Sequence, residues 1–221
     1  IDRSRGLGDV YKRQYQGGIV FYLNGNGGGL IAAPSDQGQA QWGCAGTTIN
    51  GADGTAIGTG YQNTMDIEAG CTTAGTAADV CANLSLGGYS DWFLPSKDEL
   101  SLMYQNIGLG NALGLGNIGG FANWYSSSSE KVDGNVWSLN FNNGSEFGLV
   151  KISNNQVRAI RAFSSSSSNI DSYTWSPGGE TTPSITVQPT STTTYTVDVT
   201  SGSTTCQDSV VVTVNPTHEI S

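Results

Sequence analysis

Histidine is almost missing from this sequence, which contains one, His218, among 221 residues. A single imidazole near the end of the chain excludes a Ser-His-Asp relay, a Cys-His pair and a histidine-rich metal site. Long apolar runs are missing too, because none reaches the ~18 residues that a membrane-crossing helix needs. Charged residues make up only 12% of the chain, about half their usual share. These shortages exclude much enzyme chemistry and predict no membrane span in this chain.

Basic residues are few and unevenly placed. Four of the nine Lys and Arg lie in residues 1–14, and without that segment five basic and sixteen acidic residues remain, a net charge of −11. Such a surface repels phosphate backbones, so we expect no nucleic-acid partner. Residues 1–14 also differ in composition from the chain after them and lack the apolar core of a signal peptide. We interpret them as a non-native leader, and residues 217–221 as a similar tail.

Glycine is abundant, with 31 residues, and Ser, Thr and Asn are frequent. The chain is nevertheless expected to fold, because five Trp, nine Tyr and six Phe are enough to build hydrophobic cores. The serine run Ser164–Ser168 cannot bury surface and predicts a flexible linker. We therefore expect a domain over residues 15–163, a linker over 164–170 and a second module over 171–216.

The second module has the pattern of β-strands. Runs rich in β-branched and aromatic residues, separated by Pro, Gly and Ser, cover residues 172–176, 184–188, 193–200 and 209–215. Tyr195, Val197 and Val199 alternate with polar residues, so one face of that strand is expected to be buried. A complete β-sandwich needs ~100 residues. The sequence therefore predicts part of a sandwich.

The first domain begins with a hairpin pattern and continues with short helices. Apolar runs over 18–23 and 30–33 are joined by a Gly- and Asn-rich turn. Helices are expected over 62–69 and 77–84 and after Ser96. Thr76 with Asp79, and Ser96 with Glu99, have the spacing of capping boxes.

Four β-rich runs follow these helices, over 123–129, 135–141, 146–152 and 156–163. Tight-turn sequences such as Asp-Gly and Asn-Asn-Gly join them, which predicts an antiparallel meander. The order of hairpin, helices and meander predicts an α+β fold, in which two or three short helices pack beside an antiparallel sheet.

Three segments of the first domain resemble a known family. They are GGYSDWFLPSKDEL (Gly87–Leu100), the strand beginning Trp-Tyr-Ser (Trp124–Ser128) and VRAIRAF (Val157–Phe163). Over about residues 17–163 they are similar to the Lcl C-terminal-type domains, named from the Legionella collagen-like protein. The resemblance implies a C-type-lectin-like fold, a bacterial cell-surface or secreted protein and a non-enzymatic binding or adhesive role. The second module resembles the Ig-like or PKD-like modules of large bacterial surface proteins.

The family resemblance carries over few functional residues. The calcium-binding Glu-Pro-Asn and Trp-Asn-Asp motifs of sugar-binding C-type lectins have no counterpart here. A weak calcium site at Glu130 and Asp133 is an open alternative, but we predict no metal and no cofactor.

Four cysteines permit three complete pairings. Cys44 and Cys71 both follow a glycine in expected loops, and a bridge between them would contribute roughly 3 kcal/mol in an oxidising compartment. Cys71–Cys81 is the rival pairing, although Cys81 lies on the apolar face of its helix and is expected to be a buried free thiol. Cys206 belongs to the second module. A zinc site is not expected, because there is no C-x-x-C motif.

The candidate ligand-binding surface follows the strand 135–141. Alternation places Trp137, Leu139 and Phe141 on the core side and an amide-rich set on the other side. Amides both donate and accept, which suits hydroxyl-rich ligands, and an exposed ring of the adjacent Trp-Tyr pair could stack on a sugar. The alternative is a solvated strand face with turn-forming Asn. The candidate residues are Trp124, Glu130, Asp133, Asn135, Asn140, Asn142 and Asn143.

Enzymatic features are weak. Asp98 and Glu99 are explained by helix capping, and nothing indicates that Asp91, Glu130 and Asp133 converge as a glycosidase pair would. A G-x-G-x-x-G match over 114–119 lies in an expected long surface loop, 106–120, rather than between a strand and a helix. Formylglycine-generating chemistry needs a late reactive cysteine pair, and residues 82–163 contain no cysteine.

The sequence therefore predicts a non-enzymatic, extracellular module that recognises a glycan or a surface protein. The alternative is a structural spacer in a large surface protein. The oligomeric state stays open.

Overall fold

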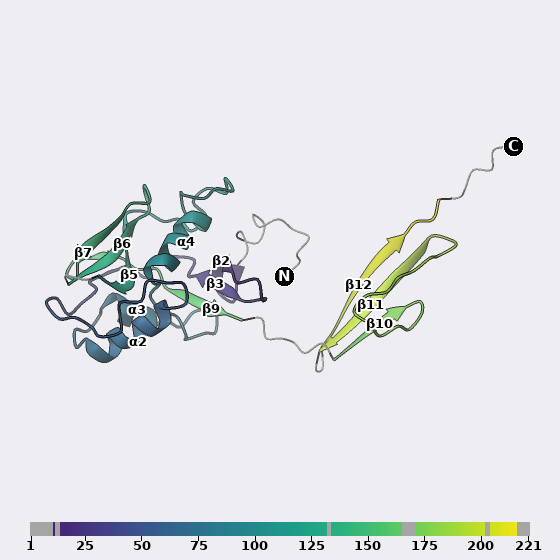
Figure 1. The fold of residues 1–221 in the computed structure, drawn as a ribbon, viewed down its shortest axis with the longest axis horizontal. Coiled ribbons are helices and arrows are strands. Elements are labelled where there is room, and N and C mark those ends of the chain that lie inside the picture. Colours follow the sequence, from purple (N-terminus) through teal and green to yellow (C-terminus); the bar gives the residue numbers. More distant parts are fainter. Residues whose placement is uncertain (1–10, 12–13, 132–133, 165–170, 202–203, 216–221) are drawn as a thin grey trace. The chain divides into compact units, whose positions relative to one another are not determined.

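A computed structural model of the chain describes residues 11, 14–131, 134–164, 171–201 and 204–215. The chain divides into two compact units, Ile1–Ser164 and Ser165–Ser221 (Figure 1). Asp133, His218, most of the expected leader, residues 165–170 of the linker and the tail lie outside the described residues. Two residues of the leader are described: Tyr11 is buried against the core, and Gln14 begins a strand. No helix in the described ranges has the length and apolar character to cross a membrane.

A four-stranded sheet brings the beginning and the end of the first unit together. Its strand order is β1-β2-β3-β9, and all neighbours are antiparallel. The bounds are Gln14–Tyr15 for β1, Gly18–Leu23 for β2, Gly29–Ala32 for β3 and Ile160–Phe163 for β9. The expected hairpin is confirmed as β2 and β3, and β3 and most of β2 are buried.

A second, five-stranded sheet has the order β4-β8-β5-β6-β7. Its bounds are Gln39–Ala40 for β4, Asn155–Gln156 for β8, Trp124–Glu130 for β5, Asn135–Asn140 for β6 and Glu146–Val150 for β7. Consecutive strands β5, β6 and β7 form the antiparallel meander that the turn sequences predict.

The prediction of a fourth meander strand over residues 156–163 is wrong. This segment divides into β8, which runs parallel to β5, and β9, which joins the other sheet. Between them Arg158 is buried and binds Asp36, with Nε 2.7 Å from Oδ1, while its Nη1 donates to the Ala33 carbonyl. This anchored crossover carries the chain from one sheet to the other.

Helices lie at the three expected places, and two of them begin with the expected capping boxes. The three helices are α2 (Gly60–Gly70), α3 (Ala77–Ala82) and α4 (Lys97–Ile107). Thr76 accepts a hydrogen bond from the Asp79 amide, and Ser96 accepts one from the Glu99 amide. Helix α4 buries its apolar side against β2, β5 and β6, and Figure 1 shows it between the two sheets. The first unit is therefore a mixed α+β structure.

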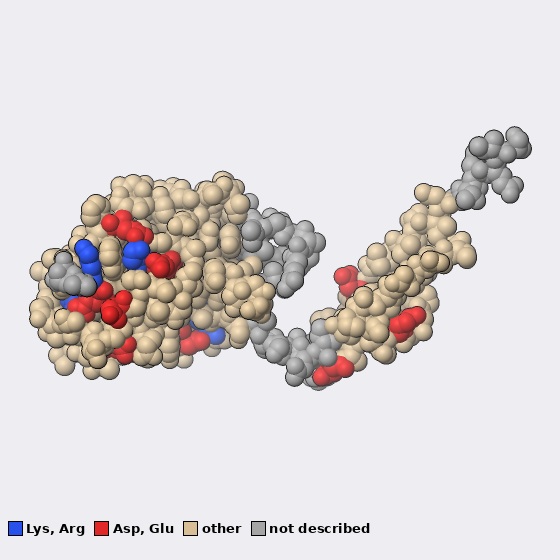
Figure 2. All heavy atoms as spheres, viewed as in Figure 1, with Lys and Arg blue, Asp and Glu red and all other residues tan. Residues whose placement is uncertain are grey.

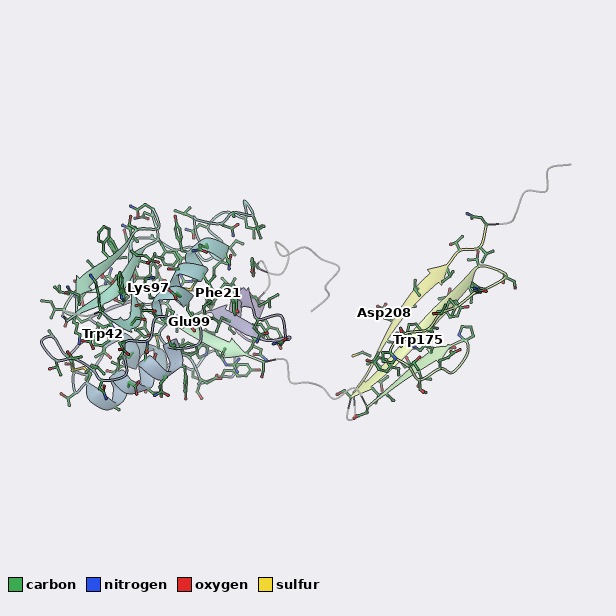
Figure 3. The ribbon with its side chains drawn as sticks, viewed as in Figure 1. Phe21, Trp42, Lys97, Glu99, Trp175 and Asp208 are labelled. Atoms are coloured by element: carbon green, nitrogen blue, oxygen red, sulfur yellow. A yellow bond between two sulfur atoms is a disulfide. The ribbon has the colours of Figure 1, made fainter. Side chains whose placement is uncertain are left out.

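Aromatic side chains fill the core of the first unit. Trp42 and Trp92 are almost completely buried, and the Trp42 indole Nε1 donates to the Ser127 carbonyl at 3.1 Å. Figure 3 labels Trp42 and Phe21 within the first unit, and Phe21 lies on β2, which packs against α4. Trp92 is core as predicted.

The cysteines behave largely as expected. Cys44 and Cys71 form a disulfide with their Cα atoms 5.6 Å apart, and the rival Cys71–Cys81 pairing is not formed. Cys81 is a buried free thiol, and burial raises its pKa. Cys206 is free and exposed.

In the described part of the second unit, β10 (Ser172–Ser176), β11 (Thr193–Ser201) and β12 (Thr204–Val212) form an antiparallel sheet. Tyr195 is buried, and Trp175 lies opposite Val197 across the β10–β11 pair (Figure 3). The strand expected over 184–188 does not form. Prolines at 183 and 189 bracket it, and proline cannot donate a ladder hydrogen bond.

Candidate functional site

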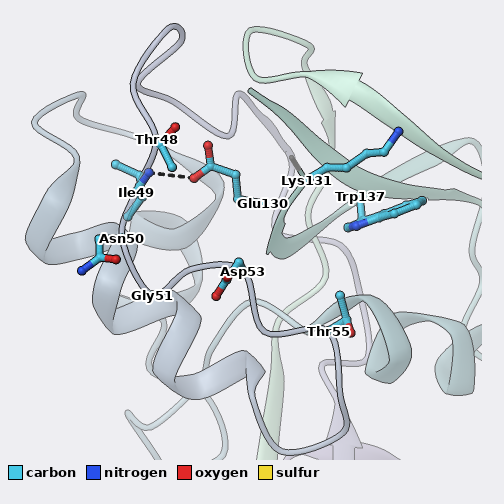
Figure 4. A pocket seen from close by; sticks show the side chains of 9 residues that line it. All are labelled: Thr48, Ile49, Asn50, Gly51, Asp53, Thr55, Glu130, Lys131 and Trp137. Atoms are coloured by element: carbon cyan, nitrogen blue, oxygen red, sulfur yellow. Dashed lines mark hydrogen bonds between the residues drawn. The ribbon is translucent and has the colours of Figure 1, made fainter. Parts of the chain in front are cut away.

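A pocket of about 550 Å³ opens on the first unit between the loop 48–55 and the strands β5 and β6. Its volume is in the range of small-ligand sites, ~300–1,000 Å³. Figure 4 shows the loop residues on one side, with Lys131 and Trp137 opposite. The lining residues are Thr48, Ile49, Asn50, Gly51, Asp53, Thr55, Glu130, Lys131 and Trp137.

A buried ion pair fixes the base of this loop. Glu130 Oε1 lies 2.7 Å from Lys151 Nζ, and Glu130 Oε2 accepts a hydrogen bond from the Ile49 amide at 2.7 Å. Lys151 also donates to the Thr47 carbonyl, and its ammonium lies 4.3 Å from the centroid of the Trp42 ring. Because Oε1 of Glu130 is ion-paired with Lys151 and Oε2 accepts a hydrogen bond from Ile49, this residue orders the pocket wall.

Hydrogen bonds from two helices and a strand hold the rest of the loop. The Gly54 carbonyl accepts from Asn63 Nδ2 and from Ser129 Oγ, both at 2.6 Å. The Thr55 carbonyl accepts from the Asp98 amide at the start of α4 at 3.0 Å. The pocket wall is therefore fixed by contacts to α2, α4 and β5, which favours binding without a large rearrangement.

Trp137 is the aromatic residue that lines the pocket, and the prediction that its side chain belongs to the core is wrong. It is only partly buried, whereas Leu139 on the same side of β6 is buried. Helix α4 packs against β6 and explains the difference. It begins at Lys97, whose ammonium lies 5.5 Å from the Trp137 ring centroid, so Trp137 lies at the end of the helix rather than beneath it. The helix therefore covers Leu139 and leaves part of the indole open to the pocket.

Two lysines lie over the Trp137 ring in different electrostatic settings. Lys97 Nζ is 3.0 Å from Glu146 and 3.2 Å from Asp98. Burial opposes its charge, but these two partners raise the pKa of Lys97 overall. Lys131 Nζ is 5.0 Å from the ring centroid and has no ion pair with any described residue. Figure 2 shows acidic and basic side chains interspersed on this unit.

The candidate residues from the sequence do not converge on one site. Glu130 lines the pocket, and Asn135 lies beside it, with its carbonyl accepting a hydrogen bond from the Lys131 amide. The other described candidates lie at the far end of the same strands, where Trp124 pairs with Asn140. Asp133 is outside the described residues.

The far group is engaged in local turns. Asn140 Oδ1 accepts from the Asn142 amide at 2.9 Å, and Asn143 Oδ1 accepts from the Ser145 amide at 3.0 Å. Asn142 Oδ1 accepts from the Asn123 amide at 3.4 Å. These contacts match the turn-forming alternative. Trp124 is partly buried with its ring 6.0 Å from that of Phe147.

The supposed polar face of β6 is also partly interior. Ser138 is buried, and its hydroxyl and that of Ser126 lie within hydrogen-bond distance of Asn155 Nδ2, at 3.4 and 3.0 Å. The short strand β8, which pairs with β5 in the same sheet, supplies Asn155. The alternation of residues in β6 alone could not predict that residues 155–156 would form a strand of this sheet.

Carboxylates elsewhere in the unit have structural partners. Asp91 pairs with Arg161. Glu99 is buried, which raises its pKa, although its carboxylate accepts from the Ser96 and Gly58 amides, each at 2.8 Å. Glu68 faces Asp79, and burial together with this neighbour raises the pKa of Glu68 to about 7. No group of three His, Cys, Asp or Glu suited to a metal ion occurs within the described ranges.

Sequence reasoning missed the central residues of the pocket, namely Asp53, Lys131 and Trp137. The loop 48–55 carries no motif, and only the Asp-Gly pair in the sequence Lys-Val-Asp-Gly-Asn, shortly before Trp137, predicts a turn at this end of the sheet. No family model matches the chain, and no curated protein matches it.

Proposed function

We propose that the first unit is a non-enzymatic binding module of a bacterial surface or secreted protein, and that it recognises an extracellular glycan at the 48–55 pocket. The observation that carries this proposal is the partly exposed Trp137 indole at a preformed pocket of about 550 Å³. A flat aromatic ring with hydroxyl and amide groups around it suits the mixed apolar and polar surface of a sugar.

The polar groups of the loop supply the hydrogen-bonding side of such a site. Thr48 and Asn50 are exposed, and Thr55 is partly exposed. Hydroxyls and amides both donate and accept, as sugar hydroxyls do. The anchored loop would therefore present these groups with little ordering cost on binding.

The architecture supports the extracellular assignment and the proposed fold family. The Cys44–Cys71 disulfide is typical of an oxidising compartment. The α+β arrangement, with short helices beside antiparallel strands, agrees with a C-type-lectin-like domain of the Lcl C-terminal type. We extend the same proposal to the second unit, whose single sheet is consistent with part of an Ig-like or PKD-like module.

The state of the carboxylates supports binding rather than hydrolysis. Glycosidases of the usual kind need two carboxyl groups facing each other across the bound sugar. Of the two acidic residues that line the pocket, Glu130 is held by Lys151 and Ile49, which leaves Asp53 alone.

A protein-packing role, as a spacer or assembly unit, is the second candidate. The edge strand β7 and the residues after it expose Phe147, Val150 and Ile152. Exposed apolar groups of this kind mark protein contacts. Sedimentation of the purified protein over a concentration series tests this candidate, which requires self-association that a charged substitution at Phe147 removes.

Binding of immobilised glycans and isothermal titration of the best ligand test the proposed function. Trp137→Ala is expected to weaken binding at least tenfold, because it removes the stacking surface. Trp124→Ala is the matched control, since it removes a partly buried tryptophan from the other end of the neighbouring strand. Loss of binding in Trp124→Ala, with Trp137→Ala unaffected, would place the site at the far end of the sheet and contradict the proposal.

A further inference from the structure

Resting on the proposed function, we infer that the pocket selects neutral hexopyranose units over uronic acids, sulfated sugars and charged peptides. The inference comes from the balance of charge around the pocket. Glu130 is paired with Lys151, and beside the pocket Lys97 is shared by Asp98 and Glu146, which leaves that cluster with one excess negative charge.

Two charges at the pocket have no ion-pair partner among the described residues, and they have opposite signs. Asp53 is exposed on the loop wall, and Lys131 lies on the opposite wall beside Trp137 (Figure 4). They do not form a salt bridge with each other. Among the described lining residues, the pocket therefore presents one strong acceptor and one strong donor, whose two charges cancel.

This arrangement discriminates by charge. An anionic ligand is attracted to Lys131 and repelled by Asp53, whereas a cationic ligand is attracted to Asp53 and repelled by Lys131. A neutral polyol gains from both, because one hydroxyl donates to the carboxylate and another accepts from the ammonium. Hydrogen bonds to charged groups are stronger than those between neutral groups.

Trp137 adds the shape requirement. The Lys131 ammonium lies over the Trp137 ring, 5.0 Å from its centroid, so a sugar that stacks on this face displaces the ammonium from above the ring to the sugar's edge, where it can donate to a hydroxyl. The C–H face of a pyranose is apolar and fits an aromatic surface, whereas its rim of hydroxyls fits the polar walls. A neutral pyranose unit satisfies all three groups at once.

Isothermal titration of matched oligosaccharide pairs tests this inference on the whole chain. The probes are galacto-oligosaccharides against oligogalacturonates and gluco-oligosaccharides against oligoglucuronates. We expect at least one neutral member to bind about tenfold or more tightly than its uronate. Lys131→Gln should weaken neutral binding about tenfold, and Asp53→Asn should narrow the gap between neutral and acidic members. Asp208→Asn, an exposed change in the second unit, is the matched control.

The outcomes separate the inference from the function beneath it. Equal or tighter binding of the uronates, lost in Trp137→Ala, would overturn the inference and leave the glycan-binding function standing. Absence of binding to every member of both pairs would overturn both. Circular dichroism of each variant checks that the substitutions at the exposed Asp53 and the half-buried Lys131 leave the fold unchanged.

Discussion

The carboxylate of Glu130 and the ammonium of Lys151 are 2.7 Å apart, and both side chains are almost completely buried. Each group has further partners, because the Ile49 amide donates to Glu130 and the Thr47 carbonyl accepts from Lys151. The pair therefore ties the pocket loop to the end of β5 and to the segment after β7. A residue expected to touch ligand instead holds the wall of the pocket in place.

Removal of one partner of this pair should be strongly destabilising. Lys151→Met leaves the Glu130 carboxylate buried without a counter-charge, and the expected loss in the free energy of unfolding is about 3–5 kcal/mol. The double variant Glu130→Gln with Lys151→Met should recover part of this loss, because no buried charge is left unpaired. Urea unfolding measures both, and a double variant as unstable as Lys151→Met would contradict the explanation.

The Cys44–Cys71 disulfide closes a long loop, because the two cysteines are 27 positions apart in the sequence. Replacement of both cysteines by serine should lower the free energy of unfolding by about 3 kcal/mol, since the unfolded chain regains the entropy of that loop. Cys206→Ser is the control, because that thiol is free and exposed. A dithiothreitol-treated wild type should match the double serine variant in thermal unfolding, and a difference in its midpoint would argue against the disulfide as the cause.

Glu68 should make stability depend on pH between about 4.5 and 7. Its pKa in the folded chain is raised to about 7 by burial and by Asp79, from an ordinary value of 4.5. The folded state therefore holds this proton where the unfolded state has released it, so stability falls as the pH rises through this window. Glu68→Gln should flatten that part of the stability profile, measured by thermal unfolding at several pH values.

The matched control for Glu68 is Asp66→Asn on the same helix, where the carboxylate accepts from Gln62 at 3.0 Å. This variant should keep the slope of the wild type. A Glu68→Gln protein whose melting temperature still falls across the window as steeply as the wild type would refute the assignment of the slope to Glu68.

Glu99 joins two segments by capping α4 and binding the Gly58 amide. Glu99→Ala should lower the free energy of unfolding by about 2 kcal/mol or more, because it removes the helix cap and leaves the buried Ser96 amide unpaired. Asp98→Ala, a half-exposed neighbour in the same helical turn, should have a smaller effect. Gly60 has no room for a side chain, since a Cβ there would lie 2.2 Å from Glu99 Oε2. Chemical unfolding of these variants measures the differences.

Local structure could be predicted from the sequence, because its causes are local. Both capping boxes place their side-chain and amide partners three residues apart, and both form. The hairpin of β2 and β3 and the meander of β5 to β7 follow in the same way from turn residues between alternating runs.

The distant pairings could not be predicted in this way. Nothing in the local pattern of residues 155–163 says that the first two join β5 in parallel while the last four join β3. The same limit applies to the site. Alternation assigns Trp137 to a side of β6 correctly, but how deeply it is buried depends on where α4 begins. The Glu130–Lys151 pair leaves no periodic pattern in the sequence, because Glu130 ends β5 and Lys151 follows β7.

The different burial of the tryptophans gives this protein an intrinsic optical probe. Trp42 and Trp92 are shielded from solvent, whereas the Trp137 indole is partly open and lies beneath two ammonium groups. A solute that occupies the pocket would change the polarity around Trp137 and its access to a dissolved quencher such as acrylamide. Emission should therefore respond to occupancy in the unlabelled chain, and the response should vanish in Trp137→Phe, which keeps a ring but loses the fluorophore.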